Sequence, residues 1–133
     1  MKNIRKIILA LSLLFNVIFM GLFFIDSLPR NESHKVTFNI QNNSDKEIID
    51  VQLKLNSHRG SKELVNVKLL AQKSKVDIST KVQVEGESNL TVEFFDSNLK
   101  AHKETIVGYT EGPLDSSIEV LVNEDLSVKS SVQ

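Results

Sequence analysis

The chain begins with an uncharged apolar run that restricts the structures open to it. From Ile7 to Ile25, 16 of 19 residues are hydrophobic, and the exceptions are Ser12, Asn16 and Gly21. At about 1.5 Å per residue, a helix of this length spans roughly 28 Å, close to the roughly 30 Å hydrocarbon thickness of a bilayer. The run therefore predicts one N-terminal transmembrane helix.

A cleaved secretory signal peptide is the alternative to an anchor. The apolar core of such a peptide covers about 7–15 residues and is followed by small side chains at the cleavage site. Here the run is longer, and it ends in the bulky residues Phe23, Phe24 and Ile25. We therefore expect an uncleaved signal-anchor, with secretion after cleavage as the alternative.

The charges that flank the run predict its orientation. Lys2, Arg5 and Lys6 precede it, and positively charged flanks stay in the cytoplasm. The prediction is a single-pass protein of the cell membrane with its C-terminal domain outside the cytoplasm. The chain has no cysteine, which for an exported domain favours a bacterial protein of the cell envelope. Four segments are expected: a cytoplasmic basic tail (residues 1–6), the anchor helix (7–25), a stem (26–33) and an extracytoplasmic domain (34–133).

Two polar residues interrupt the predicted anchor. Ser12 and Asn16 are four positions apart and therefore share one face of a helix. A carboxamide within a bilayer gains from a hydrogen-bonding partner on another helix. Ser12 and Asn16 are therefore candidates for helix association, although a single Asn is also tolerated without a partner.

The remainder of the chain has a composition and a periodicity typical of strands. From Asp26 onward, 19 of 36 hydrophobic residues are Val or Ile, which favours β-structure. Apolar and polar residues alternate there with a period of two, as on half-buried strands. The alternating stretches are Val36–Ile40, Ile49–Leu55, Val65–Leu69, Val76–Val84, Leu90–Phe94, His102–Tyr109, Ile118–Val122 and the short Leu126–Val128.

Short strands with one apolar face each must bury that face against another sheet. The sequence therefore predicts an all-β fold: a small immunoglobulin-like β-sandwich of 7–8 strands that follows the transmembrane helix. A small β-barrel is the alternative. The chain contains neither Cys nor Trp, so the disulfide and core tryptophan of true immunoglobulin domains are absent, and the expected likeness is one of architecture only.

No motif in the sequence indicates catalysis. The three histidines, His34, His58 and His102, belong to none of the spaced motifs of hydrolases or zinc enzymes. A catalytic triad is defined by geometry rather than by spacing, so an enzyme without a recognisable motif stays an alternative. We expect a protein that is not an enzyme and has no catalytic residues.

Metal and cofactor sites are not predicted either. The acidic stretch that starts at Asp96 resembles the beginning of a calcium loop, but Lys100 and Ala101 stand where that loop needs an oxygen ligand and a glycine. Acidic residues in turns are usually plain turn formers.

Charge is distributed unevenly along the chain. Residues 30–82 hold ten basic and six acidic side chains, whereas residues 83–133 hold three basic and ten acidic ones. Strands from the two halves that alternate in space would pair these charges. A more specific hypothesis is a patch that binds a basic partner. Its candidate residues are Glu85, Glu87, Glu111, Asp115 and Glu119.

Tyr109 is the only tyrosine and lies between Gly108 and Gly112. A glycine within a strand indicates a bulge or a close backbone approach, and a tyrosine offers an amphipathic ring to a partner. We consider Tyr109 a candidate binding residue. The structural alternative is a hydroxyl that bonds the backbone at a sheet corner.

These features together predict a membrane-anchored binding module with a protein partner at the cell envelope and no cofactor. Nucleic acid is disfavoured because the domain is net acidic and lacks a basic stripe. The alternatives are an accessory subunit that works through its transmembrane helix and a secreted or anchored enzyme. The sequence leaves the oligomeric state open.

Overall fold

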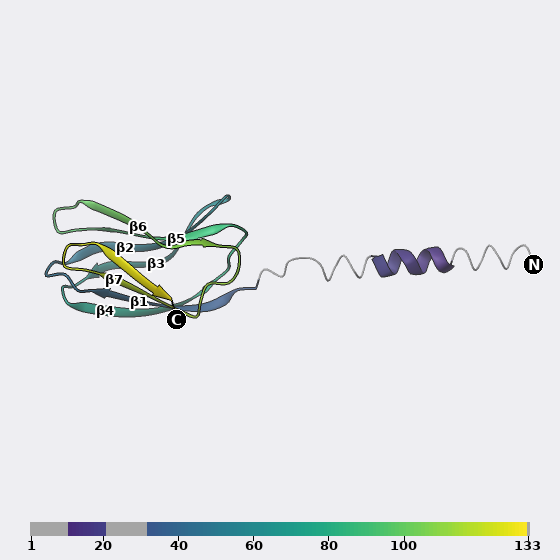
Figure 1. Ribbon diagram of the computed structural model, residues 1–133, viewed down its shortest axis with the longest axis horizontal. Helices are drawn as coiled ribbons and strands as arrows, with labels where there is room; N and C mark the ends of the chain where they lie inside the picture. The colour runs from purple at the N-terminus through teal and green to yellow at the C-terminus, as the bar shows by residue number, and fades with distance from the viewer. Residues whose placement is uncertain (1–10, 21–31, 133) are drawn as a thin grey trace, which may run out of the picture. The chain divides into compact units, whose positions relative to one another are not determined.

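The computed structural model describes residues 11–20 and 32–132 (Figure 1). The chain divides into two compact units, Met1–Arg30 and Asn31–Gln133. The predicted basic tail, both ends of the predicted anchor and most of the stem lie outside the described residues.

In the first unit, residues 11–20 are helical, as predicted for the middle of the apolar run. Within the described residues, no helix is both long enough and apolar enough to cross a membrane. The side-chain amide of Asn16 donates a hydrogen bond of 2.8 Å to the backbone carbonyl of Ser12 in the same helix. The carboxamide thus has a partner within its own helix, and the association of helices through Ser12 and Asn16 stays a prediction.

The second unit confirms the all-β prediction, because it consists of strands joined by turns and loops. Eight strands are present in the described residues, the number at the upper limit of the prediction. They are β1 (His34–Asn42), β2 (Ile48–Ser57), β3 (Gly60–Leu70), β4 (Ser74–Val82), β5 (Ser88–Phe95), β6 (Ala101–Thr110), β7 (Ser117–Val122) and β8 (Val128–Val132).

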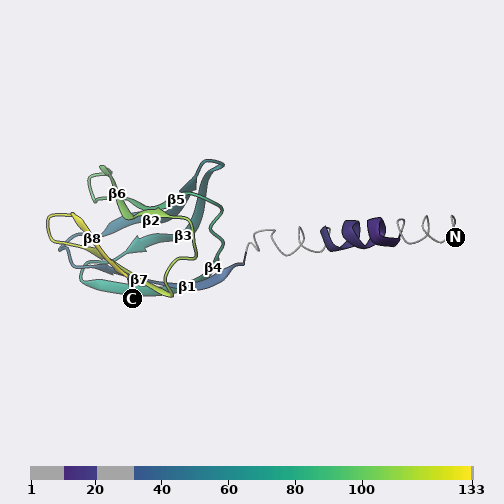
Figure 2. The same cartoon turned by 45° about the vertical axis from the view of Figure 1, so that its right-hand side comes forward.

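The strands form two four-stranded sheets, which Figure 2 shows as two layers. The strand orders are β4-β1-β7-β8 and β3-β2-β5-β6. β1 and β7 are parallel, and every other pairing is antiparallel. Because the two sheets are separate ladders in the described part of the chain, the strands do not close into the small barrel that was the alternative.

The core lies between the layers and takes its side chains from both. Phe38 and Ile118 come from one sheet, Leu53 and Phe94 come from the other, and each is at most 1% exposed. The period-two alternation of the sequence explains this burial, because alternate residues of a strand point to opposite faces of its sheet. Removal of this apolar surface from water is the main force that holds the layers together.

On β2 and β3, two side chains lie away from the faces that simple alternation predicts. Asp50 has a φ of 52° at a shift in the β2–β5 register, so Ile48 is fully buried while Ile49, predicted to face the core, is only half-buried. On β3, Leu70 is buried and Leu69 is 55% exposed. The predicted core residues Ile49 and Leu69 are therefore on the outer face.

The two oppositely charged halves of the chain alternate in space. β1 and β4 from the basic half share a sheet with β7 and β8 from the acidic half. Lys54 of the basic half forms an ion pair with Glu93 of the acidic half, and Lys73 pairs with Glu124 at 3.1 Å. Part of the charge asymmetry is therefore neutralised within the fold.

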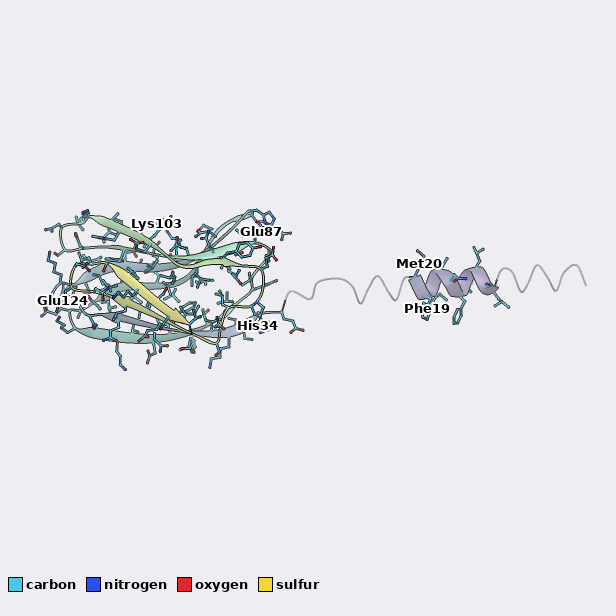
Figure 3. The ribbon with its side chains drawn as sticks, in the orientation of Figure 1. Phe19, Met20, His34, Glu87, Lys103 and Glu124 are labelled. Atoms are coloured by element: carbon cyan, nitrogen blue, oxygen red, sulfur yellow. The ribbon has the colours of Figure 1, made fainter. Side chains whose placement is uncertain are left out.

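The domain has an entry end and a far end. The entry end is where β1 begins at His34, and the far end is where β1 finishes at Asn42. Figure 3 shows His34 and Glu87 at the entry end and Glu124 at the far end.

A fully buried asparagine ties the loops of the far end together. The Asn42 amide donates to the carbonyls of Lys46, Leu70 and Ala71 at 2.8, 3.3 and 3.1 Å. Its side-chain oxygen accepts bonds from the Ser44 backbone and hydroxyl at 3.0 and 2.7 Å. Asn42 therefore satisfies backbone groups that the turns would otherwise leave unpaired.

Candidate functional site

The candidate site is built from three segments that meet at the entry end. The loop of residues 83–87 connects β4 of one sheet to β5 of the other. Ser88, which follows that loop, is paired with Thr110 at the end of β6 and with Ser57 at the end of β2. The β2–β3 turn, the 83–87 loop and the last residues of β6 are therefore neighbours, although they lie far apart in the sequence.

Tyr109, Glu111 and Glu87 form the first part of the site, which we call the acidic tyrosine cluster. Tyr109 is 63% exposed. The nearby Glu111 carboxylate, partial desolvation and the charge of Glu87 raise the pKa of Tyr109 to about 12. The hydroxyl thus stays protonated at physiological pH. The cluster presents an aromatic ring and two acids to solvent.

Local structure explains how the cluster is held. Leu114 is only 7% exposed and belongs to the core, so it attaches the loop after β6, including Glu111, to the body of the domain. Gly86 has a φ of 68°, which side chains other than glycine rarely adopt. A Cβ atom at Gly86 would lie 3.7 Å from Cε1 of His58, so the loop that carries Glu87 is close to the β2–β3 turn.

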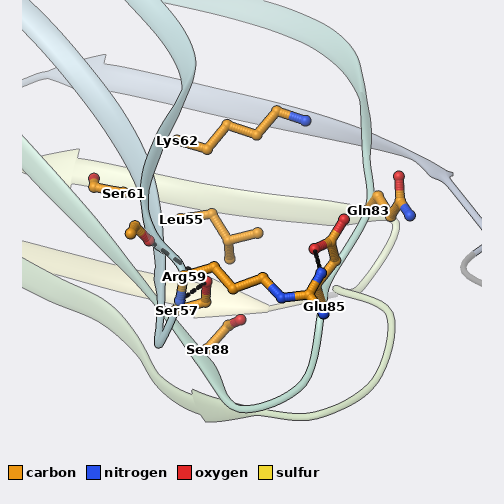
Figure 4. A pocket seen from close by; sticks show the side chains of 9 residues that line it. Leu55, Ser57, Arg59, Ser61, Lys62, Gln83, Glu85 and Ser88 are labelled. Carbon is orange, nitrogen blue, oxygen red and sulfur yellow. Dashed lines mark hydrogen bonds and ion pairs between the residues drawn. The ribbon is translucent and has the colours of Figure 1, made fainter.

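A shallow hollow of about 200 Å³ adjoins the 83–87 loop (Figure 4). The buried side chain of Leu55 contributes to its lining. All but one of the remaining lining residues have a hydroxyl, amide or charged side chain, and the exception is a glycine. The remaining residues are Ser57, Arg59, Gly60, Ser61, Lys62, Gln83, Glu85 and Ser88. Such a lining suits polar contacts at a partner surface rather than an apolar ligand.

An ion pair between two residues that line the hollow connects the β2–β3 turn to the 83–87 loop. Nη1 of Arg59 lies 2.7 Å from Oε2 of Glu85, and Figure 4 shows the two side chains meeting across the hollow. Arg59 is 67% exposed and Glu85 is 38% exposed. Glu85 is thus already neutralised by Arg59, whereas Glu87 and Glu111 are exposed.

The remaining predicted acidic residues do not all join the cluster. Asp115 is exposed in the loop that follows Leu114. Glu119 is on β7 in the other sheet, where it accepts a hydrogen bond of 2.8 Å from the Ser131 hydroxyl. The structure therefore places Tyr109, Glu87 and Glu111 together with Glu85 beside them, and it places Glu119 apart.

One histidine supports a turn at the far end. The His102 ring stacks on Phe94 with centroids 4.9 Å apart, and its Nε2 lies 3.2 Å from Oδ2 of Asp96. Asp96 also accepts hydrogen bonds from the backbone of Asn98 and Lys100 at 2.8 and 3.0 Å. These contacts close the β5–β6 turn, so the pair of His102 and Asp96 has a structural role.

The three histidines do not converge on one pocket. His102 lies near the far end, whereas His34 starts β1 and His58 lies in the β2–β3 turn at the entry end. Across residues 11–20 and 32–132, no group of three or more His, Cys, Asp or Glu side chains is placed to hold a metal ion. The absence of enzymatic activity stays a prediction.

Sequence reasoning missed the hollow and the ion pair between Arg59 and Glu85. The Ser57–Gly60 stretch reads as a loop, but its contact with the 83–87 loop follows from the order of strands in the sheets, which no local pattern encodes. The closeness of Tyr109 and Glu111 was easier to anticipate, because the two residues are only two positions apart.

Comparison with known proteins gives a structural likeness but no family. No protein-family model matches the chain, and no curated protein matches it. A solved structure described as "NMR structure of the protein from Eubacterium rectale" is 14% identical, covers 80% of this chain and 93% of its own, and superposes with a TM-score of 0.47. The function is therefore inferred from the residues of this chain.

Proposed function

We propose that this protein is a single-pass membrane protein of a bacterial cell envelope that displays a small immunoglobulin-like β-sandwich outside the cytoplasm as a non-catalytic binding module. The anchor keeps the module beside membrane and envelope partners and so raises its effective concentration there. The uncharged run of residues 7–25 and the basic residues before it support the anchor and its orientation. Two four-stranded sheets around a common core support the sandwich.

The observation that carries the binding role is the acidic tyrosine cluster. Tyr109 is the only tyrosine and most of its surface is exposed, so it contributes little to the core. The largest cause of its raised pKa is the Glu111 side chain, rather than a backbone group as at a sheet corner. Tyrosine is enriched at the energetic centres of interfaces, and its ring face attracts cations.

The chemistry of the cluster selects a basic partner. A Lys or Arg side chain could lie on the Tyr109 ring while its charge meets Glu87 and Glu111. Burial of the contact by the partner would strengthen both interactions, because the local dielectric falls. We therefore propose a protein partner that inserts a basic side chain at the entry end.

The proposal is tested by crosslinking in intact cells of the native host, with identification of the captured proteins. The informative variant is Glu87→Gln with Glu111→Gln, which removes both charges and preserves the size of the side chains. The matched control is Glu63→Gln with Glu104→Gln, because these acids are also exposed but lie elsewhere on β3 and β6. We expect capture of one partner to be lost only in the first variant. Equal capture by both variants would reject the cluster as the site.

A second experiment separates the module from its anchor. Replacement of residues 1–25 by an unrelated single-pass anchor of the same orientation keeps the domain outside and removes Ser12 and Asn16. A binding module retains its partner after this exchange. Loss of the partner would instead favour an accessory subunit that works through its helix.

A further inference from the structure

The two sheets together have four edge strands, and three of them carry features that discourage pairing with another chain. The β2–β3 register shifts between Leu53 and Lys54, and the β5–β6 register shifts twice. β8 has only five residues, and its Ser130 hydroxyl bonds the Ile106 carbonyl of β6 at 2.8 Å. Bulges, short strands and covering contacts are the usual means by which edges avoid association.

β4 is the exception among the four. It pairs with β1 without a break from Ser74 to Val82. Among the described residues, no backbone hydrogen bond joins the strand to any partner other than β1. Its inward side chains Val76 and Ile78 are only half-buried although they pack against the core. One long side of β4 therefore offers regular backbone donors and acceptors beside incompletely covered apolar groups.

We propose that β4 binds β4 of a second copy of this chain, antiparallel, with Ser79 opposite Ser79 of the partner subunit. The two sheets β4-β1-β7-β8 would then join into one continuous sheet across a two-fold axis. This proposal concerns a surface other than the acidic tyrosine cluster and is independent of it.

The charges on the outer face of β4 favour this register. With the two Ser79 residues opposite one another, Asp77 faces Lys81 of the partner subunit, and the same contact occurs twice by symmetry. Asp77 already accepts a bond of 2.7 Å from the Asn39 amide through Oδ1, which leaves its second oxygen for the lysine. Cross-strand pairs of opposite charge stabilise a sheet.

Two of the other registers are disfavoured by the same side chains. A pairing centred on Ile78 places Lys75 opposite Lys81 of the partner subunit, and one centred on Asp77 places two carboxylates opposite one another. Like charges directly opposite destabilise strand pairing. The pairing centred on Ser79 instead places Lys75 opposite an uncharged residue, Gln83 of the partner subunit. On the inward face it brings Val76 against Val82 of the partner subunit.

The absence of cysteine from the chain makes a direct test possible. The full chain is purified in detergent micelles as single-cysteine variants and oxidised. Opposite residues of paired strands have Cα atoms about 4.5–5.5 Å apart, within the range for a disulfide. We expect Ser79→Cys to form a covalent dimer, and Lys103→Cys on β6 to remain a monomer. Dimers of both variants, or of neither, would overturn the proposal.

Exchange of charged residues on β4 tests the register and distinguishes an effect on strand pairing from a loss of folding. Lys81→Asp should weaken dimerisation about tenfold, because two favourable pairs become repulsive. Lys75→Asp makes the same change of charge on the same strand and should leave dimerisation unchanged. Addition of Asp77→Lys to Lys81→Asp restores opposite charges and should recover the dimer.

Circular dichroism confirms that each variant is folded. A Lys81→Asp variant that dimerises like the wild type would overturn the proposed register. Crosslinking of Ser79→Cys to an unrelated protein in cells, instead of to its own copy, would show that the β4 edge serves another partner and would also overturn the proposal.

Discussion

The Glu111 carboxylate is the largest cause of the raised pKa of Tyr109, which is about 12. Ionisation of the hydroxyl would place an anion beside the carboxylates of Glu111 and Glu87, which is why the neutral form is favoured. The relationship links a side chain of β6 to the loop that follows it.

The first prediction concerns this pKa. In a Glu111→Gln variant, the pKa of Tyr109 falls from about 12 towards the ordinary value of about 10. Because the chain has one tyrosine and no tryptophan, tyrosinate absorbance reports this residue alone. The control is Glu104→Gln, with circular dichroism to show that the domain is folded over the titration. An unchanged pKa in Glu111→Gln would contradict the assigned contact.

The second prediction concerns the contribution of Tyr109 to stability. Tyr109→Phe removes a hydroxyl at a residue that is 63% exposed, so the free energy of unfolding should change by less than about 0.5 kcal/mol. Denaturant titration measures this. A loss of more than about 1.5 kcal/mol would instead indicate the structural role of a corner tyrosine.

The third prediction concerns the asparagine at the far end. Asn42→Leu should lower the free energy of unfolding by about 2–4 kcal/mol, because buried carbonyls and the Ser44 backbone lose their partner. Asn98→Leu, at an exposed position, is the matched control and should change stability by less than about 0.5 kcal/mol. Similar costs at both positions would show that Asn42 does not organise the far-end loops.

The fourth prediction concerns acid stability. Backbone hydrogen bonds from Lys100 and Asn98, together with His102, hold the pKa of the Asp96 carboxyl below its ordinary value. A lowered carboxyl pKa in the folded state stabilises the fold above the unfolded pKa, and the contribution is lost as pH falls through the folded pKa. Asp96→Asn should therefore lose stability at neutral pH and show a shallower decline in stability below about pH 4.

Thermal unfolding at a series of pH values measures the effect of Asp96→Asn. The exposed Asp115→Asn serves as the control for removal of one carboxylate. A decline below pH 4 as steep in Asp96→Asn as in the wild type would contradict the assignment.

The fifth prediction concerns the core. Phe38→Ala removes a ring that is fully buried on β1 and should cost about 3–5 kcal/mol. Phe95→Ala makes the same change on β5 at a residue that is 39% exposed, and it should cost much less. Chemical denaturation measures the loss in the free energy of unfolding for both variants. Equal losses would contradict the assignment of Phe38 to the core.

The strand pattern could be predicted from sequence because burial on one face leaves a local signal. Val36, Phe38 and Ile40 alternate with polar residues, and all three are fully buried on β1. The signal fails at Ile49, because the positive φ of Asp50 shifts the register and no alternating pattern reveals this in advance. The face of the sheet on which a side chain lies can therefore be predicted where the strand is regular, but not where a bulge intervenes.

The candidate site was less predictable because its parts come together through topology. Tyr109 and Glu111 are close in the chain and could be grouped from sequence, but the pairing of Arg59 with Glu85 depends on which strands are neighbours. Glu119 belongs to the acidic half of the chain, but it lies on the other sheet and is not part of the cluster. Net charge along a sequence thus does not define a surface patch.

The binding role of the acidic tyrosine cluster is tested most directly by a photo-activated crosslinking residue placed at position 109 of the full chain in intact cells. Position 103 on the same strand is the matched control, because Lys103 is also exposed. We predict that position 109 captures a specific basic protein and position 103 does not. Capture of the same proteins from both positions, or of none from position 109, would contradict the proposed function.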